Sequence, residues 1–181
     1  MFDIRKAAPE DALGITIVNV YTWKTAYSGL MSEEAIDSRI AGLLEKSEKC
    51  RADIEQNDNF YVAAIGHTVI GFCCYGISRN PAYRNSGEIY GLYALKGYQG
   101  LGVGRTLFSA AADALSAKGF SSLIVNCLHG NPSLGFYQHM GGKIVAQRED
   151  DLYGTHITED VLYFETETER PIGSADKLHR I

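Results

Sequence analysis

The chain has 181 residues, with 17 lysines and arginines against 22 aspartates and glutamates, so its formal net charge is −5. A hydrophobic fraction of 45% and a charged fraction of 22% are typical of a globular domain, and they exclude a disordered or fibrous protein. The sequence has no cluster of basic residues of the kind that binds nucleic acid. No apolar run reaches the roughly 20 residues needed to cross a membrane. The acidic balance favours a cationic substrate.

The four cysteines have no CxxC spacing, so the sequence predicts neither a zinc site nor a disulfide framework. The N-terminus carries no apolar signal core. We therefore expect a cytoplasmic protein that works in a reducing compartment without a metal ion.

A short strand over residues 2–5 and a helix that opens at Pro9 come first in the chain. The strand alternates polar and apolar residues, and proline is favoured in the first turn of a helix. The apolar positions of this first helix are predicted to be Leu13, Ile17, Val20 and Tyr21.

Ser32 has the side chain of a helix N-cap, and Met31 and Ile36 are spaced as a hydrophobic staple across that cap. The sequence therefore predicts a second helix after Ser32. A more polar helix is expected over residues 45–56.

Two β-rich runs, residues 60–65 and 68–78, are separated only by Gly66 and His67, which predicts an antiparallel hairpin. A polar loop then leads to an apolar strand over residues 88–95. Gly91 within that strand indicates a bulge or a close backbone approach.

A glycine-rich turn over residues 100–104 precedes an amphipathic helix that ends at Gly119. The apolar positions of this helix follow helical spacing: Leu107, Ala110, Ala111, Ala114 and Leu115. A short buried strand follows at residues 123–125.

The remaining elements are a helix that begins at Asn131-Pro132 and stops at Gly141-Gly142, and two last strands at residues 143–147 and 161–166. We assign residues 1–166 to one domain and residues 167–181 to a loose C-terminal tail.

The glycine turn is the most informative motif, because a strand, a glycine turn and a helix in succession bring backbone N–H groups to a helix N-terminus that attracts phosphate. A dinucleotide fingerprint requires glycine at position 105, which is arginine. A P-loop requires Gly-Lys-Ser/Thr, and the chain has Gly104-Arg105-Thr106. Both of these phosphate-binding folds are therefore excluded, whereas a tight turn without a ligand remains an alternative.

The chain resembles the GNAT superfamily of acetyl-CoA-dependent N-acetyltransferases, whose signature Gln/Arg-x-x-Gly-x-Gly/Ala is matched by Gln99, Gly102 and Gly104. Residues 92–95 are similar to the central strand of that family, and residues 131–142 to its later Asn…Phe-Tyr…Gly-Gly element. The resemblance implies an α/β (α+β) fold with a mixed, mostly antiparallel sheet of seven strands. A V-shaped cleft between residues 88–95 and 122–127 would split this sheet, with helices on both faces.

The resemblance also implies acetyl-CoA as co-substrate. The glycine turn would hold its pyrophosphate and the edge of the preceding strand its pantetheine arm. The implied cofactor-binding residues are Leu92, Tyr93, Ala94, Gln99, Gly100, Leu101, Gly102, Val103, Gly104, Arg105 and Asn131. Asn131 also fits a helix N-cap, and both roles can hold together. Lys96 stands where the family often has proline, and Leu101 where it often has a basic residue.

Acetyl transfer to an amine requires removal of a proton from an amine whose pKa is about 10.4, and a proton for the leaving thiolate. Glu88 is the predicted base, directly or through water, and an exposed strand-end carboxylate is the alternative. Tyr137 matches the frequent general acid of the family, and a core aromatic beside Phe136 is the alternative.

Trp23 and Tyr27 are predicted to form an acceptor wall, with packing as the alternative. The expected acceptor is a small amine or polyamine, or else a protein N-terminus, a lysine or an antibiotic. A non-catalytic acyl-CoA sensor is the competing class of protein. Homodimers through the terminal strands are common in the family, so a homodimer is a further expectation.

Overall fold

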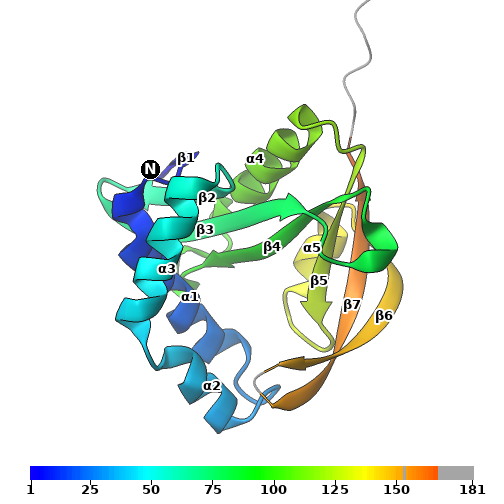
Figure 1. Cartoon of the computed structure of the whole chain (residues 1–181), viewed down its shortest axis with the longest axis horizontal. Helices are drawn as coiled ribbons and strands as arrows, with labels where there is room; N and C mark the ends of the chain where they lie inside the picture. The colour runs from blue at the N-terminus through cyan, green and yellow to red at the C-terminus, as the bar shows by residue number, and fades with distance from the viewer. Residues whose placement is uncertain (153, 167–181) are drawn as a thin grey trace, which may run out of the picture.

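The computed structural model describes residues 1–152 and 154–166 (Figure 1). Its strands are β1 (Asp3–Lys6), β2 (Phe60–Ile65), β3 (Thr68–Ile77), β4 (Gly87–Ala94), β5 (Ser122–Leu128), β6 (Lys143–Leu152) and β7 (Thr155–Glu165). Its helices are α1 (Ala12–Ala26), α2 (Glu33–Ile40), α3 (Leu43–Gln56), α4 (Val103–Ala117) and α5 (Leu134–His139). Three short 3-10 turns complete the described elements: Pro9–Asp11, Pro81–Tyr83 and Lys96–Tyr98.

The seven strands form one mixed sheet in the order β1-β2-β3-β4-β5-β7-β6. Every neighbouring pair is antiparallel except β4 and β5, which run parallel. These two strands pair only at their first residues, from Gly87 with Leu123 to Ile89 with Val125. Beyond Ile89 they diverge, so the predicted fold class and the predicted split of the sheet are both confirmed.

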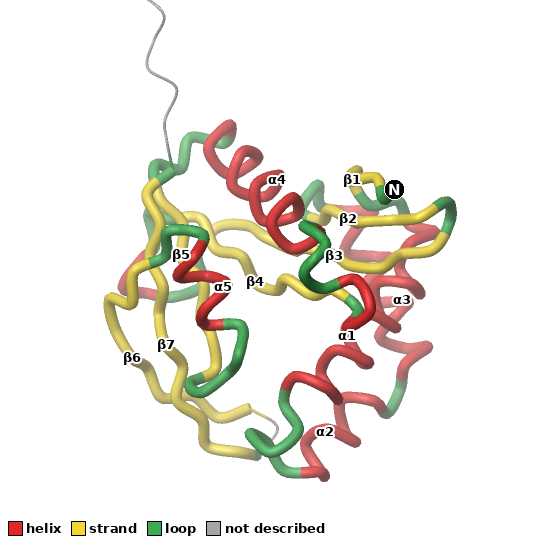
Figure 2. Tube along the Cα trace, turned by 180° about the vertical axis from the view of Figure 1, so that it is seen from behind, coloured by secondary structure: helices red, strands yellow, loops and turns green. Residues whose placement is uncertain are grey.

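Helices cover both faces of the sheet. The helices α1 and α3 lie on the face turned towards the viewer in Figure 1, and α4 and α5 lie on the opposite face, seen in Figure 2. The buried face of α4 presents Leu107, Ala111 and Leu115, each with an exposed fraction of 0%, to the sheet. The predicted apolar stripe of α4 is therefore the face of the helix that packs in the core.

Local signals set the start of α2 as predicted. Ser32 Oγ accepts a hydrogen bond from the Ala35 backbone N–H at 3.2 Å, which satisfies one of the free donors at the helix start. Met31 and Ile36 are both buried in one apolar cluster, as the staple requires. The hairpin of β2 and β3 and the left-handed Gly119 after α4 are confirmed as well.

The predicted apolar face of α1 is wrong. Leu13, Ile17 and Tyr21 are exposed, with fractions of 41%, 37% and 65%, and only Val20 of the predicted stripe is buried. The helix instead buries a different set of residues against the sheet and α2: Ala12, Ile15, Thr16, Val18, Thr22 and Trp23. Both faces of this helix are apolar, so periodicity does not decide which one meets the sheet.

The last two strands are longer than predicted. They span Lys143–Leu152 and Thr155–Glu165 and pair as one long antiparallel hairpin. The extra length is rich in acidic residues, because most of β6 is exposed and its side chains face water. The predicted tail, residues 167–181, lies outside the described residues.

The middle of β4 carries a bulge. Cys74 pairs with Gly91 and Tyr75 pairs with Ile89, so Tyr90 is the extra residue on β4. The predicted irregularity is confirmed one residue before Gly91. A Cβ atom on Gly91 would lie 2.9 Å from the Tyr93 ring and 3.3 Å from Cys74 Sγ, which leaves room for glycine alone without displacement.

Candidate active site

The strand β4 leads into the glycine turn that opens α4. Gly100 and Gly102 have φ angles of 76° and 87°, in the left-handed region where other residues are strained. Gly102 is the N-cap of α4, and no side chain caps this terminus. The first backbone N–H groups of the helix, from Val103 on, are therefore free to bind an external acceptor. Such a terminus carries about half a positive charge, which suits a phosphate group.

A cavity of about 450 Å³ lies at this helix terminus, between the end of β4 and α5. Most of the predicted cofactor residues line it: Leu92, Tyr93, Ala94, Gln99, Gly100, Gly102, Gly104 and Arg105. The cavity is completed by residues of the α5 segment, namely Pro132, Ser133, Phe136, Tyr137 and His139. The chain thus brings both parts of its sequence motif to one hollow.

Of the predicted cofactor residues, Leu101, Val103 and Asn131 do not line this cavity. Leu101 is 63% exposed, and Val103 is 1% exposed because it packs in the core under the sheet. Only their backbone groups belong to the turn. Gln99 has a structural contact as well, since its Nε2 donates to the Ala94 carbonyl at 3.0 Å and closes the turn back onto β4.

A second cavity fills the split between β4 and β5. It shares six residues with the cofactor-side cavity, so the two hollows are continuous: Leu92, Tyr93, Ala94, Gln99, Ser133 and Tyr137. Its other walls come from α1 and from β5, including Thr22, Tyr27 and Asn126. We call this second cavity the cleft.

Tyr137 lies where the two cavities meet. Its side chain is 7% exposed, and its ring packs edge-on against Phe136 with centroids 5.2 Å apart. Burial, followed by the neighbouring Cys127 and Tyr93, raises the pKa of Tyr137 well above its ordinary value. The phenol therefore keeps its proton at neutral pH and is a hydrogen-bond donor at the cleft.

Glu88 is buried, not exposed at the strand end. Its carboxylate accepts from the Arg79 backbone N–H at 2.7 Å and from Arg79 Nη2 at 2.9 Å. Asn126 Nδ2, which belongs to a residue lining the cleft, lies 3.4 Å from Glu88 Oε1. Glu88 itself does not line the cleft. It lies behind Asn126, which forms part of the cleft wall.

The two predicted acceptor residues differ in position. Tyr27 lines the cleft, whereas Trp23 is 5% exposed and packs in an apolar cluster with Met31, Ile36 and Leu128. Trp23 Nε1 donates to the Tyr93 hydroxyl at 3.2 Å. Trp23 therefore lies behind the cleft wall, and its hydrogen bond orients Tyr93.

Asn131 also lines the cleft, and its Oδ1 accepts from the Ser133 backbone N–H at 2.8 Å. The helix α5 starts at Leu134, so Asn131 stabilises the turn that precedes the helix instead of capping its first residue. The predicted helix start at Asn131-Pro132 is therefore wrong: the N-cap is Ser133, and no side chain caps it.

Sequence reasoning missed two polar groups of the cleft. Thr22 Oγ1 and Asn126 Oδ1 are buried, and no described residue forms a hydrogen bond with either atom. Both residues line the cleft from opposite sides, one on α1 and one on β5. A buried oxygen without a partner costs about 1–3 kcal/mol, so these two atoms indicate that a ligand or water donates to them. Neither position belongs to a motif, which is why the sequence alone gave no signal.

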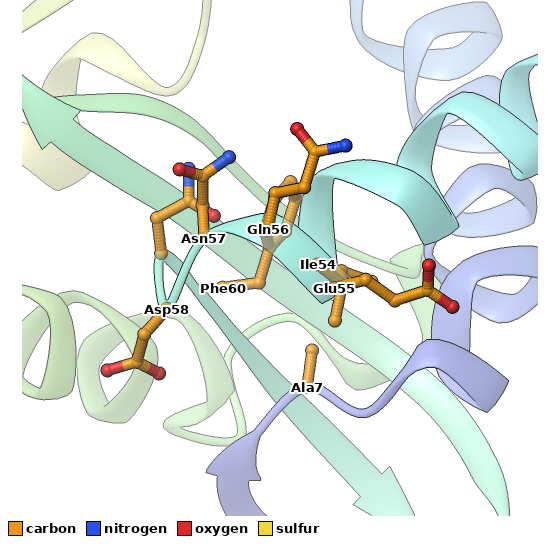
Figure 3. A pocket seen from close by; sticks show the side chains of 8 residues that line it. Ala7, Ile54, Glu55, Gln56, Asn57, Asp58 and Phe60 are labelled. Carbon is orange, nitrogen blue, oxygen red and sulfur yellow. The ribbon is translucent and has the colours of Figure 1, made fainter.

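Another hollow, of about 290 Å³, lies at the junction of α3 and β2 (Figure 3). The polar ends of Glu55, Gln56 and Asp58 point away from one another there, so they form no convergent set of ligands. The described residues contain no group of three or more His, Cys, Asp or Glu side chains placed to hold a metal ion. Among the same residues, no helix is long and apolar enough to cross a bilayer.

The fold and the continuous cavity at a glycine turn define a protein of the acyl-CoA-dependent transferase class. The model of the acetyltransferase (GNAT) family matches residues 23–142. The chain therefore belongs to the GNAT family, and it is an N-acetyltransferase.

Three similar proteins agree with this assignment. An uncharacterized N-acetyltransferase, YuaI of Bacillus subtilis, is 30% identical over 159 residues, which are 88% of this chain and 90% of that protein. A spermidine N(1)-acetyltransferase of Thermoplasma acidophilum is 30% identical over 151 residues, 78% of this chain and 88% of that protein. The crystal structure of the PaiA N-acetyltransferase of T. acidophilum in complex with coenzyme A has a TM-score of 0.72 and 25% identity, and the match covers 91% of this chain and 99% of that chain.

Proposed function

We propose that the chain transfers the acetyl group of acetyl-CoA directly to a primary amine of a small molecule. The observation that carries this proposal is the free edge of β4. Because β4 pairs with β5 only as far as Ile89, its later backbone groups on the β5 side have no strand partner, while β3 pairs with the other edge. This free edge, the glycine turn and Tyr137 border one continuous hollow.

The residues present fit acetyl-CoA. The uncapped N-terminus of α4 provides backbone donors for a pyrophosphate, and the edge at Leu92, Tyr93 and Ala94 provides donors and acceptors for an extended amide-containing arm. Arg105 adds a positive side chain at the cavity wall. When bound, the co-substrate supplies an acetyl thioester, and these residues would position it.

The acceptor amine must lose a proton before it can attack a carbonyl. Thr22 Oγ1 and Asn126 Oδ1 are free acceptors that would orient the amine N–H groups. Glu88 is the proposed base, and its contact with Asn126 supports a route through water. Direct contact would require the Arg79 side chain, which is 64% exposed, to leave Glu88.

Tyr137 is the proposed acid. In the transfer, a C–N bond forms and the C–S bond breaks, so the amine proton goes to the base and the sulfur receives a proton. The Tyr137 hydroxyl is protonated and borders both cavities, which supports its role as the donor to the sulfur. Trp23 and Tyr27 would act on the acceptor side, Tyr27 at the cleft and Trp23 through Tyr93.

The proposed acid is tested by Tyr137→Phe. Removal of a general acid lowers kcat about 100-fold, because general acid catalysis contributes roughly 10² to 10⁴ in rate. The dissociation constant of acetyl-CoA, measured by calorimetry, should stay within about twofold of the parent value. Tyr21→Phe is the matched control, since Tyr21 is exposed on α1. Equal turnover numbers for Tyr137→Phe and the parent would remove Tyr137 from the mechanism.

The overall reaction is tested by thiol release from acetyl-CoA with small amines, polyamines, aminoglycosides and N-terminal peptides. The spermidine acetyltransferase relative supports a polyamine acceptor. Calorimetric binding of acetyl-CoA with no turnover of any amine would favour the alternative, an acyl-CoA sensor. Failure to bind acetyl-CoA at millimolar concentration would contradict the proposal itself.

A further inference from the structure

A third cavity adjoins the cleft on the face covered by α1 and α3. It has a volume of about 340 Å³ and shares Tyr90, Gly91 and Tyr93 with the cleft. Successive turns of α1 line the two hollows. Thr16 and Asn19 line the third cavity, and Thr22 lines the cleft. The two hollows therefore adjoin along α1 and share part of the β4 wall, and we call the pair the groove.

The charge of this third cavity is positive. Four cationic side chains line it, from α2, from α3 and from the loop after β3: Arg39, Lys46, Lys49 and Arg79. No carboxylate is among its described lining residues. The nearby acids lie in the surrounding structure, where Glu45 pairs with Lys49, Glu88 lies beneath Arg79, and Asp53 accepts from Asn57.

Two of the cations are fixed in place by polar contacts. Arg39 Nη2 donates to Asn19 Oδ1 at 2.6 Å, and its guanidinium lies over the Trp23 ring at 5.1 Å. Lys46 Nζ donates to the carbonyls of Arg39 at 2.6 Å and Ser38 at 3.1 Å, at the end of α2. The Lys46 ammonium keeps its charge in these contacts, because its partners are neutral carbonyl oxygens.

Arg79 closes the groove at the strand side. Its guanidinium stacks over the Tyr90 ring at 4.0 Å, and Tyr90 is the bulged residue shared with the cleft. One nitrogen of this guanidinium, Nη2, donates to Glu88, yet the Arg79 side chain is 64% exposed. A planar guanidinium in this position has donors left for a second anion.

We infer that the acceptor carries an anionic group, a carboxylate or a phosphate, which binds in this cationic cavity while its amine lies at Thr22 and Asn126. This inference rests on the proposed function and names its acceptor class. Thr16 and Thr22 are about 9 Å apart along the helix axis, so amine and anion would be separated by a chain of a few carbon atoms. A second ammonium group of a polyamine would meet cationic side chains in the same place, of which Lys49 and Arg79 are already paired with Glu45 and Glu88, and like charges repel.

The inference is tested with three amines of five carbon atoms that differ only at the far end: 5-aminopentanoate, pentylamine and cadaverine. The far end is an anion, a methyl group and a cation, respectively. We expect kcat/KM to be at least tenfold higher for 5-aminopentanoate than for pentylamine, and lowest for cadaverine. The pair 3-aminopropylphosphonate and propylamine distinguishes a phosphate-like group from a carboxylate.

Charge variants locate the effect. Arg39→Gln should reduce the preference for 5-aminopentanoate over pentylamine at least fivefold. Lys49→Gln should reduce it about twofold, and this exposed position keeps the test valid if Arg39→Gln does not fold. Lys24→Gln, an equal loss of charge on the exposed side of α1, should leave the preference unchanged.

Binding of the same three amines, followed by calorimetry in the presence of CoA, separates this inference from the proposed function. Preferential binding of 5-aminopentanoate without turnover would support the cationic subsite and contradict the transferase reaction with this amine class. Equal or better binding or turnover of cadaverine would overturn the inference and favour a polyamine. Absence of binding of both 5-aminopentanoate and 3-aminopropylphosphonate at millimolar concentration in the presence of CoA would overturn it as well.

Discussion

The two sides of the cleft are built in different ways. The proposed cofactor side consists mainly of backbone, namely the free edge of β4 and the uncapped terminus of α4 behind the left-handed Gly100 and Gly102. The proposed acceptor side consists of side chains that come from α1, α2, α3, β5 and the loop after β3. On this proposal, backbone geometry holds the co-substrate, whereas the choice of acceptor depends on side chains brought together by folding.

The largest expected effect is on the backbone side. Gly104→Asp places a carboxylate at the cavity wall next to the N-terminus of α4, where it would occupy the positive end of the helix and repel the pyrophosphate. We expect acetyl-CoA affinity to fall at least 100-fold by calorimetry, which corresponds to about 2.7 kcal/mol. Gly97→Asp is the control, because Gly97 is in open space and does not line the cavity. Unchanged acetyl-CoA affinity in Gly104→Asp would place the co-substrate elsewhere.

The next prediction concerns Glu88, which lies on the acceptor side behind the cleft wall. Glu88→Gln preserves the shape of the side chain and removes its charge, so kcat/KM at pH 7 should fall about 100-fold if the carboxylate takes the amine proton. The deficit should shrink as the pH approaches about 10.4, because the free amine then needs no base. A pH profile of kcat/KM checks this, and a deficit that is constant with pH would mean that Glu88 only positions Arg79 and Asn126.

Thr22→Val tests the acceptor side with two readouts of opposite sign. The substitution replaces a buried hydroxyl that has no partner among the described residues, so the free protein should be equally stable or more stable by about 1 kcal/mol. The KM for the amine should nevertheless rise about tenfold, while the KM for acetyl-CoA stays constant. Urea unfolding and steady-state kinetics measure the two effects. A lower stability with unchanged KM would show that Thr22 is only part of the core.

These differences explain how much of the site could be predicted from the sequence. The glycine turn and Tyr137 belong to local motifs, so most of the predicted cofactor residues could be named from the sequence, and they line one cavity. Thr22, Asn126 and Arg39 are scattered over the chain and meet only because α1, α2 and β5 pack around one cleft. The net charge of −5 suggested a cationic substrate, yet charge is not distributed evenly, and the cavity beside the cleft carries four cations.

The same limit applies to the fold. The cap at Ser32, the hairpin turn and the stripe of α4 are local and were predicted correctly. The cap at Asn131 was not, and neither was the buried face of α1, because that helix is apolar on both sides. For Glu88, the predicted base, the sequence left an exposed strand-end carboxylate as the alternative, and the structure shows that the side chain is buried. Its burial depends on Arg79, which is nine residues earlier and joins it only when β3 and β4 pair.

The smallest expected effect concerns the attachment of α1 to the sheet. Asp11, at the start of this helix, accepts from Arg5 Nη1 at 2.6 Å and Nη2 at 2.8 Å, and from the Ala8 backbone N–H. Burial tends to raise the pKa of Asp11, but the hydrogen bonds from Arg5 and Ala8 outweigh it, so the pKa is lowered below its ordinary value of 3.8. Stability from a lowered carboxyl pKa is present above the unfolded-state value and is lost as the pH falls through the folded-state value.

Asp11→Asn should therefore lower the free energy of unfolding by about 1 kcal/mol at pH 7, since Arg5 is partly exposed and solvent weakens the pair. The difference from the parent should shrink below pH 4 and disappear in stronger acid, as measured by urea unfolding at several pH values. Acetyl-CoA affinity should not change, because the cofactor side has no contact with this anchor, while acceptor KM should rise slightly as α1 loosens. A fall in acetyl-CoA affinity as large as the rise in acceptor KM would mean that the two sides of the cleft are coupled through the sheet and are not built independently.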